Sequence, residues 1–176
     1  MRYRFHFLVL LFSPVILFSQ EPDIPRFGTP AKFTINTAAF VYHVSPPSVP
    51  EYTQYFSNDF LNFGIRLTDK SYLSLGTLKN SFGDQMAMIG YRHIWHHFND
   101  RIFVEGLYAY AGEFFFPVFS HAGDHGVYKE FKDKIGIGFA PYVYHGVDIA
   151  ITSYLTLEVG FILPFISIAT LQISLF

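Results

Sequence analysis

Apolar and polar residues alternate with a period of two along most of the chain. In segment 60–68 one face is apolar and the other polar or small, the apolar face being Leu61, Phe63, Ile65 and Leu67 and the other Asn62, Gly64 and Arg66. This alternation is typical of a strand with one face against an apolar environment. Similar patterns predict eight strands, over 32–43, 60–68, 71–80, 85–95, 101–113, 134–144, 153–163 and a last strand that ends at Phe176.

The predicted connections alternate between short and long. Tight turns are expected at 68–71, 96–100 and 145–148, and the other connections are the long loops 44–56 and 114–133 and the short link 81–84. Long loops at one end and short turns at the other are typical of outer-membrane barrels. The pattern therefore predicts an all-β fold, an eight-stranded antiparallel up-and-down transmembrane β-barrel whose first strand runs outward.

A helical membrane span is a poorer explanation of the apolar C-terminal part. Segment 149–170 contains Glu158 and Pro164 and is rich in β-branched and aromatic residues. A helix there would place a carboxylate near the middle of a bilayer, which is costly. Tilted strands of about ten residues avoid that cost.

The N-terminus has the layout of a secretory signal. Arg2 and Arg4 precede an apolar run at 5–18, and the prolines Pro22, Pro25 and Pro30 follow. We expect a signal peptide at 1–19, an N-terminal extension at 20–31 and the barrel at 32–176; a signal anchor that stays attached is the alternative. These features predict a bacterial outer-membrane protein that contacts phospholipid and lipopolysaccharide as a monomer.

Composition supports a membrane and offers little soluble chemistry. Aromatic residues make up 20% of the chain, cysteine is absent and the net charge is −2, so neither disulfides nor nucleic-acid binding is indicated. We expect no cofactor and no metal. His93, His96 and His97 are interpreted as the edge of an aromatic girdle rather than metal ligands, and His121, Asp124 and His125 as surface-loop residues.

Four polar residues fall on or near the inward phase of central strands: Asn62, Arg66, Arg92 and Glu105. An eight-stranded barrel leaves room for side chains or one small ligand. Because buried charges require partners, Glu105 is predicted to face Arg66 or Arg92. Such a network would be a salt-bridged plug or, alternatively, the lining of a ligand cavity.

Several short motifs at the outward end resemble one enzyme family. They are His43, Asn58, Phe63-Gly64, Lys79-Asn80-Ser81-Phe82 and Ile89-Gly90-Tyr91. In these the chain resembles the lipid A palmitoyltransferase (PagP-type) barrels, which move an acyl chain from phospholipid to lipid A. The resemblance implies that His43, Asn80 and Ser81 occupy the catalytic positions. The middle position departs from the family, because asparagine replaces aspartate and can orient a histidine only by hydrogen bonding.

Two features bear on this hypothesis. His43 is in phase with Phe33, Ile35 and Val41 on the expected lipid side, unless a β-bulge redirects it. Inside the outer half, Ala38, Gly64 and Gly76 would leave space for an apolar cavity, whereas Phe40 and Phe103 would fill it. The alternative function is a non-enzymatic barrel with a structural role or a loop-mediated binding role.

Overall fold

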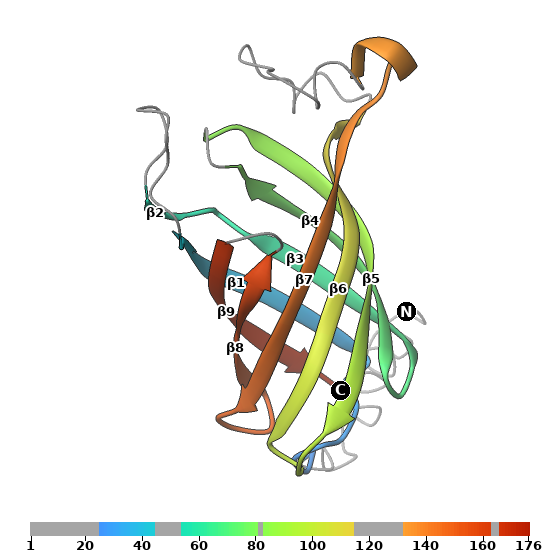
Figure 1. Cartoon of the computed structure of the whole chain (residues 1–176). Coiled ribbons are helices and arrows are strands. Elements are labelled where there is room, and N and C mark those ends of the chain that lie inside the picture. The colour runs from blue at the N-terminus through green and yellow to red at the C-terminus, as the bar shows by residue number, and fades with distance from the viewer. Residues whose placement is uncertain (1–24, 45–53, 81–82, 115–131, 163–165) are drawn as a thin grey trace, which may run out of the picture.

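The chain folds into a closed antiparallel β-barrel. A computed structural model describes residues 25–44, 54–80, 83–114, 132–162 and 166–176. The strands in chain order are β1 (Phe33–His43), β2 (Tyr55–Ser57), β3 (Leu61–Thr68), β4 (Ser71–Lys79), β5 (Gln85–His97), β6 (Ile102–Phe114), β7 (Gly138–Ala150), β8 (Leu155–Ile162) and β9 (Ile166–Leu175) (Figure 1). This confirms the predicted fold class, with one additional short strand.

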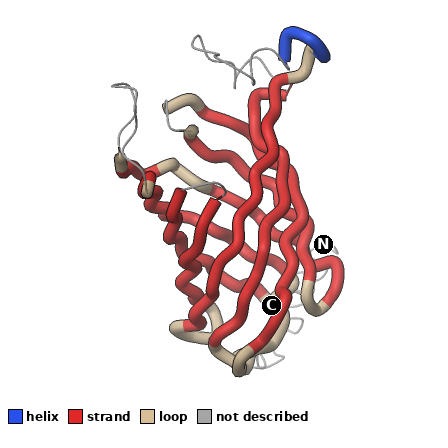
Figure 2. The backbone as a smooth tube through the Cα atoms, in the orientation of Figure 1, coloured by secondary structure: helices blue, strands red, loops and turns tan. Residues whose placement is uncertain are grey.

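Each long strand pairs with its neighbours in sequence, and β1 pairs with β9 to close the barrel. The extra strand β2 pairs with the C-terminal half of β1, while β3 pairs with the N-terminal half of β1 along the same edge. β2 and β3 therefore together occupy one strand position of the barrel, which is interrupted between them. Asp59, in this interruption, has a φ of 46°. The short turns gather at one end of the barrel (Figure 2). No helix among the described residues is long and apolar enough to cross a bilayer.

β7 differs most from the prediction. The sequence pattern placed a strand at 134–144 and a turn at 145–148, whereas β7 runs from Gly138 to Ala150. The turn lies at 151–154, where Ile151 and Thr152 donate backbone hydrogen bonds to Leu155. The apolar alternation continues through Val147 and Ile149, so His145-Gly146 is not a break. This shift moves Asp148 from a turn into the barrel wall.

The two faces of the wall differ as the alternation predicts. Large apolar side chains lie on the outer face, among them Phe63, Leu75, Ile89, Val159 and Ile173, each between 38% and 48% exposed. The inward positions of the same strands hold small or polar residues such as Ser74, which is fully buried. The outer face is thus apolar around the barrel, and the lumen carries the buried polar groups.

A β-bulge in β1 changes which residues face the lumen. The pairing of β1 with β9 slips by one residue between Thr37 and Phe40, and Ala38 has a φ of 56°. Beyond the bulge Val41 is 2% exposed and Phe40 is 50% exposed. The period of two alone placed Val41 and His43 on the outward face, and the β-bulge, which was the alternative, puts both in the inward phase. The placement of Ala38 and Phe40 inside was wrong.

Candidate functional site

The lumen is divided into layers along the barrel axis. A middle layer is polar and charged, and its buried members are Asn36, Asn62, Arg92, Glu105, Asp148, Glu158 and Gln172. An outer layer, towards the long connections, is apolar. A third compartment opens at the end with the short turns. Each layer draws on most of the strands, because inward positions recur every second residue.

Arg92 of β5 lies at the centre of the middle layer. Its Nε is 3.6 Å from Oε2 of Glu105, and its Nη1 is 3.6 Å from Oε1 of Glu158. It also donates hydrogen bonds to Gln172 and Thr34, and its guanidinium stacks over the Tyr72 ring at 4.3 Å. Glu105 is 1% exposed, so the predicted inward pairing of Glu105 with an arginine is confirmed for Arg92.

The other two predicted members of the network lie differently. Asn62 donates to Asn36 at 3.4 Å, and Asn36 donates to Glu158 at 2.5 Å, so Asn62 belongs to the middle layer. Arg66 lies nearer the short turns, where its Nη1 donates to the Pro30 carbonyl at 2.9 Å. Its position near the end of β3 brings it to the mouth rather than to Glu105.

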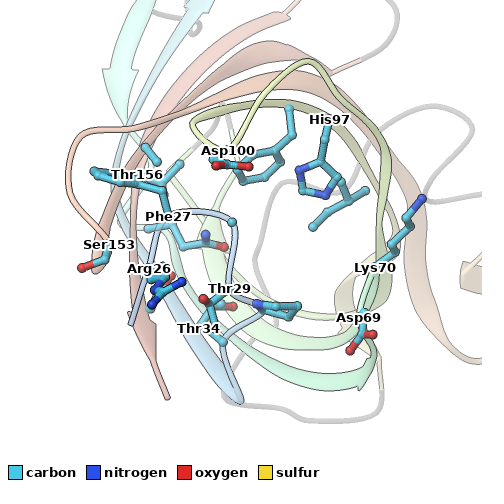
Figure 3. A pocket seen from close by; sticks show the side chains of 18 of the residues that line it. Arg26, Phe27, Thr29, Thr34, Asp69, Lys70, His97, Asp100, Ser153 and Thr156 are labelled. Carbon is cyan, nitrogen blue, oxygen red and sulfur yellow. The ribbon is translucent and has the colours of Figure 1, made fainter. Parts of the chain in front are cut away.

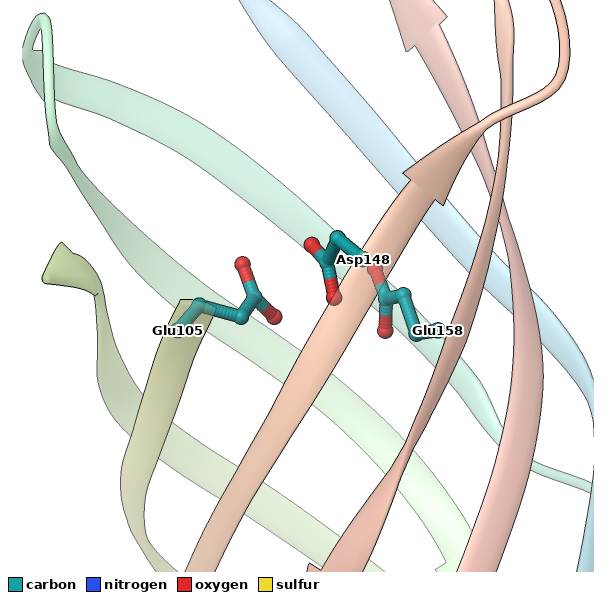
Figure 4. Close-up of side chains that lie close together, drawn as sticks. All are labelled: Glu105, Asp148 and Glu158. Atoms are coloured by element: carbon teal, nitrogen blue, oxygen red, sulfur yellow. The ribbon is translucent and has the colours of Figure 1, made fainter. Parts of the chain in front are cut away.

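Three carboxylates converge in the middle layer: Glu105 of β6, Asp148 of β7 and Glu158 of β8 (Figure 4). One oxygen of each lies within 4.8 Å of the others, and all three side chains are buried. They are the only group with such ligand geometry among the described residues. Sequence reasoning missed Asp148 by assigning it to a turn. Glu158 was in phase with buried Thr156 and Gly160, a signal that could have placed it inside.

A pocket of about 250 Å³ opens at the end with the short turns (Figure 3). The segment Arg26–Ala31 lines one side of it, and the Phe27 ring lies 4.0 Å from the Arg101 guanidinium. His97 and Asp100 line the other side, while Arg92 separates the pocket from the middle layer. This mouth is therefore polar and partly filled by the chain's own N-terminal segment.

The predicted histidine cluster is divided between two environments. On the outer face His93 stacks on Tyr91, with ring centroids 5.9 Å apart, and contacts Trp95 edge-to-face, with ring centroids 4.8 Å apart. His97 lines the pocket and packs 5.3 Å from the Phe103 ring, and His96 packs 4.9 Å from Phe98. His121 and His125 lie outside the described residues. His93, His96 and His97 belong to no metal-ligand group.

The outer half of the lumen contains an apolar cluster, with the polar side chains of Asn58 and Glu113 also buried there. The cluster's buried side chains come from six strands and the segment before β3, and they are Ala39, Val41, Phe60, Leu78, Met88, Leu107, Ala109, Ala111, Tyr142, Tyr144 and Ile168. A cavity of about 20 Å³ lies where this layer meets the charged one. The charged layer thus forms a floor beneath an apolar compartment.

The rim positions carry the residues singled out by the family resemblance. The bulge brings His43 into phase with buried Val41, and its ring stacks on Phe56 at 5.8 Å. Asn80 accepts a hydrogen bond from the Asp84 backbone at 2.9 Å, so its amide organises the link between β4 and β5. Ser81 lies outside the described residues.

The strand ladder sets the relative height of these positions. The Lys79 backbone donates to Asn58, and the Asn58 backbone donates to Ala39, so these three residues lie on one rung. His43 follows Ala39 by four residues, and Asn80 follows Lys79 by one. Measured along the strand direction, His43 therefore lies three residues, about 10 Å, beyond the rung of Asn80.

Neither a family model nor a curated protein matches this chain.

Proposed function

We propose that the chain is a bacterial outer-membrane barrel that acts on membrane lipid, transferring an acyl chain between lipids. The division of the lumen carries the proposal, because an apolar compartment lies above a charged floor. The floor blocks the path of solutes through the barrel. The apolar part is next to the rim, where lipid from the outer leaflet would enter.

The roles follow from the resemblance to the PagP-type barrels. His43 would take a proton from a hydroxyl as that oxygen attacks the donor ester carbonyl, and it would then give this proton to the departing lysolipid alkoxide. The resemblance implies that Ser81 would be a further catalytic residue at the same rim, and Asn80 would orient its neighbours by hydrogen bonds. The inward phase of His43 after the bulge supports this assignment. Asn80 lies on the rung three residues before that of His43.

A second candidate is a closed barrel without enzymatic activity. Large side chains such as Phe60, Leu78 and Met88 are at most 6% exposed in the outer half. The 20 Å³ cavity that Phe60 lines accommodates about one water molecule and no acyl chain. This packing supports a structural or loop-mediated binding role, in which the lumen only fixes the shape of the wall.

Lipid A mass spectrometry distinguishes the two functions. A strain that produces the wild-type protein should gain one acyl chain on lipid A, and H43A and S81A should each abolish that gain. H96A is the matched control, since His96 lies at the opposite end of the barrel, and it should retain the modification. Outer-membrane fractionation of every strain checks that the variants insert. An inserted wild-type barrel that leaves lipid A and phospholipid unchanged would favour the non-enzymatic role.

A further inference from the structure

The middle layer contains more acid than base. Glu105, Asp148 and Glu158 are each at most 3% exposed, and Arg92 is the cation that contacts Glu105 and Glu158 among the described residues. Three carboxylates and one guanidinium leave a formal charge of −2 in a lumen shielded from water. Uncompensated buried charge is strongly unfavourable. Either protons or a bound cation must therefore neutralise the excess acid.

Arg92 does not occupy the carboxylate oxygens fully. Its contacts with Glu105 and Glu158 are both 3.6 Å, longer than the roughly 2.7–2.9 Å of a charge-assisted hydrogen bond. Oε2 of Glu105 and both oxygens of Asp148 have no hydrogen-bond partner in the described structure. Asp148 is fully buried, yet none of its oxygens is bound by a donor. These oxygens are available as ligands.

Two further oxygens, not from carboxylates, lie at the same place. Oδ1 of Asn62 and the hydroxyl of Tyr144 are buried without hydrogen-bond partners. Both side chains line the 20 Å³ cavity together with Glu105 and Glu158. A cavity of this size holds a single water molecule or ion. An unpartnered amide oxygen in a cavity that carboxylates also line is unfavourable unless a positive group binds there.

We propose that Glu105, Asp148 and Glu158, with Asn62 Oδ1, bind one divalent cation of the calcium class inside the barrel. A divalent ion brings the formal charge of the layer to zero. Calcium binds oxygen ligands at about 2.3–2.6 Å, so two of its ligands can be up to about 4.6–5.2 Å apart. The carboxylate oxygens lie within 4.8 Å of one another. Magnesium, at about 2.0–2.1 Å, would require a tighter group.

The position of the ion explains the shape of the network. Asn36 donates to Glu158 and accepts from Asn62, which leaves the Asn62 carbonyl oxygen free to face the cavity. Arg92 also lines this cavity, and hydrogen bonds to Gln172 and Thr34 hold its guanidinium in place. The guanidinium and the cation would thus bind different oxygens of the same carboxylates. The site joins β3, β6, β7 and β8 across the lumen.

The experiment uses the folded full-length barrel in detergent at neutral pH. After chelation and desalting, calcium is titrated while thermal unfolding is followed, and bound metal is counted by elemental analysis. We expect about one calcium per chain and a melting temperature that rises with the logarithm of calcium concentration above the dissociation constant. D148N should lose both effects. Magnesium at the same concentration should give a smaller shift.

The matched control is E113Q, which removes a buried carboxylate that pairs with Lys132 near the rim. E113Q should keep the calcium response. If D148N fails to fold, E158Q takes its place, and terbium luminescence sensitised by Tyr142 and Tyr144 is measured on the wild type with calcium as competitor. Absence of bound calcium, an equal shift in the acid variants, or stabilisation by acid alone would each overturn the proposal.

Discussion

The charged middle of the lumen and its apolar outer half are built from the same strands two residues apart. On β6, Glu105 belongs to the first and Leu107 to the second, and both are buried. Around Glu105 the side chains are positioned by directional contacts with Arg92 and its partners. Around Leu107 they are positioned by shape alone. The comparison shows that the same strands can hold a layer of specific charge contacts next to a layer of apolar side chains whose packing is less specific.

The difference has an energetic consequence. A buried charge left without its partner keeps its full desolvation cost, whereas a truncated apolar side chain loses contacts that its neighbours partly recover. Substitutions in the middle layer should therefore be more severe than substitutions of similar size in the outer half. Exposed charges should matter least.

The largest effect is expected for R92M. Methionine fills part of the space but leaves Glu105, Asp148 and Glu158 without their cation, so the free energy of unfolding should fall by about 3–5 kcal/mol. Urea unfolding in lipid vesicles, with divalent ions chelated, measures it. R66M is the control, because Arg66 lies at the mouth and should cost much less. Equal urea midpoints for R92M and wild type would remove the distinction between the layers.

A smaller effect is expected for L78A in the outer half. Leu78 of β4 is 6% exposed in the apolar cluster, and truncation should cost about 2–3 kcal/mol, the low end of the range for buried leucines. The nearby rim lets neighbours close part of the space. L75A serves as the control, since Leu75 lies on the outer face of the same strand. A loss in L78A as large as that in R92M would mean that packing, not charge, sets the barrel's stability.

The smallest effect is expected for D59N. Asp59 pairs with Lys79 at 2.5 Å, but the side chains are 54% and 40% exposed. Water and salt screen such a pair, so its loss should cost less than about 1 kcal/mol. Asparagine also tolerates the positive φ at this position. Unfolding at low and high salt checks the result; a cost near that of R92M would contradict the comparison between buried and exposed charge.

The prediction of the middle layer succeeded where a residue lay inside an unbroken alternation. Glu105 and Arg92 were assigned to the lumen because their strands have a period of two, and the structure pairs them. Asp148 was missed because His145-Gly146 was interpreted as a turn. The same wrong boundary separated Asp148 from Glu158, which lies directly opposite it across the β7–β8 ladder. The excess of acid could not be seen without that pairing.

The phase of His43 depended on a β-bulge that the sequence could not locate. A β-bulge adds one residue to one strand and reverses every later position, and neither a glycine nor an asparagine stands at the bulge to indicate it. Ala38 adopts the positive φ instead, although alanine rarely does. Only the register of β1 against β9 shows where the extra residue lies.

The sequence by itself determined the strand periodicity, the apolar outer face and the barrel class, because side-chain alternation is a local property of each strand. Tertiary structure alone decided which charges meet, where β1 is bulged and how the lumen is divided. Those features depend on register and closure between strands distant in sequence. A shift of one residue moves a side chain from the outer face to the lumen, so the three carboxylates become a cluster only when β6, β7 and β8 are aligned.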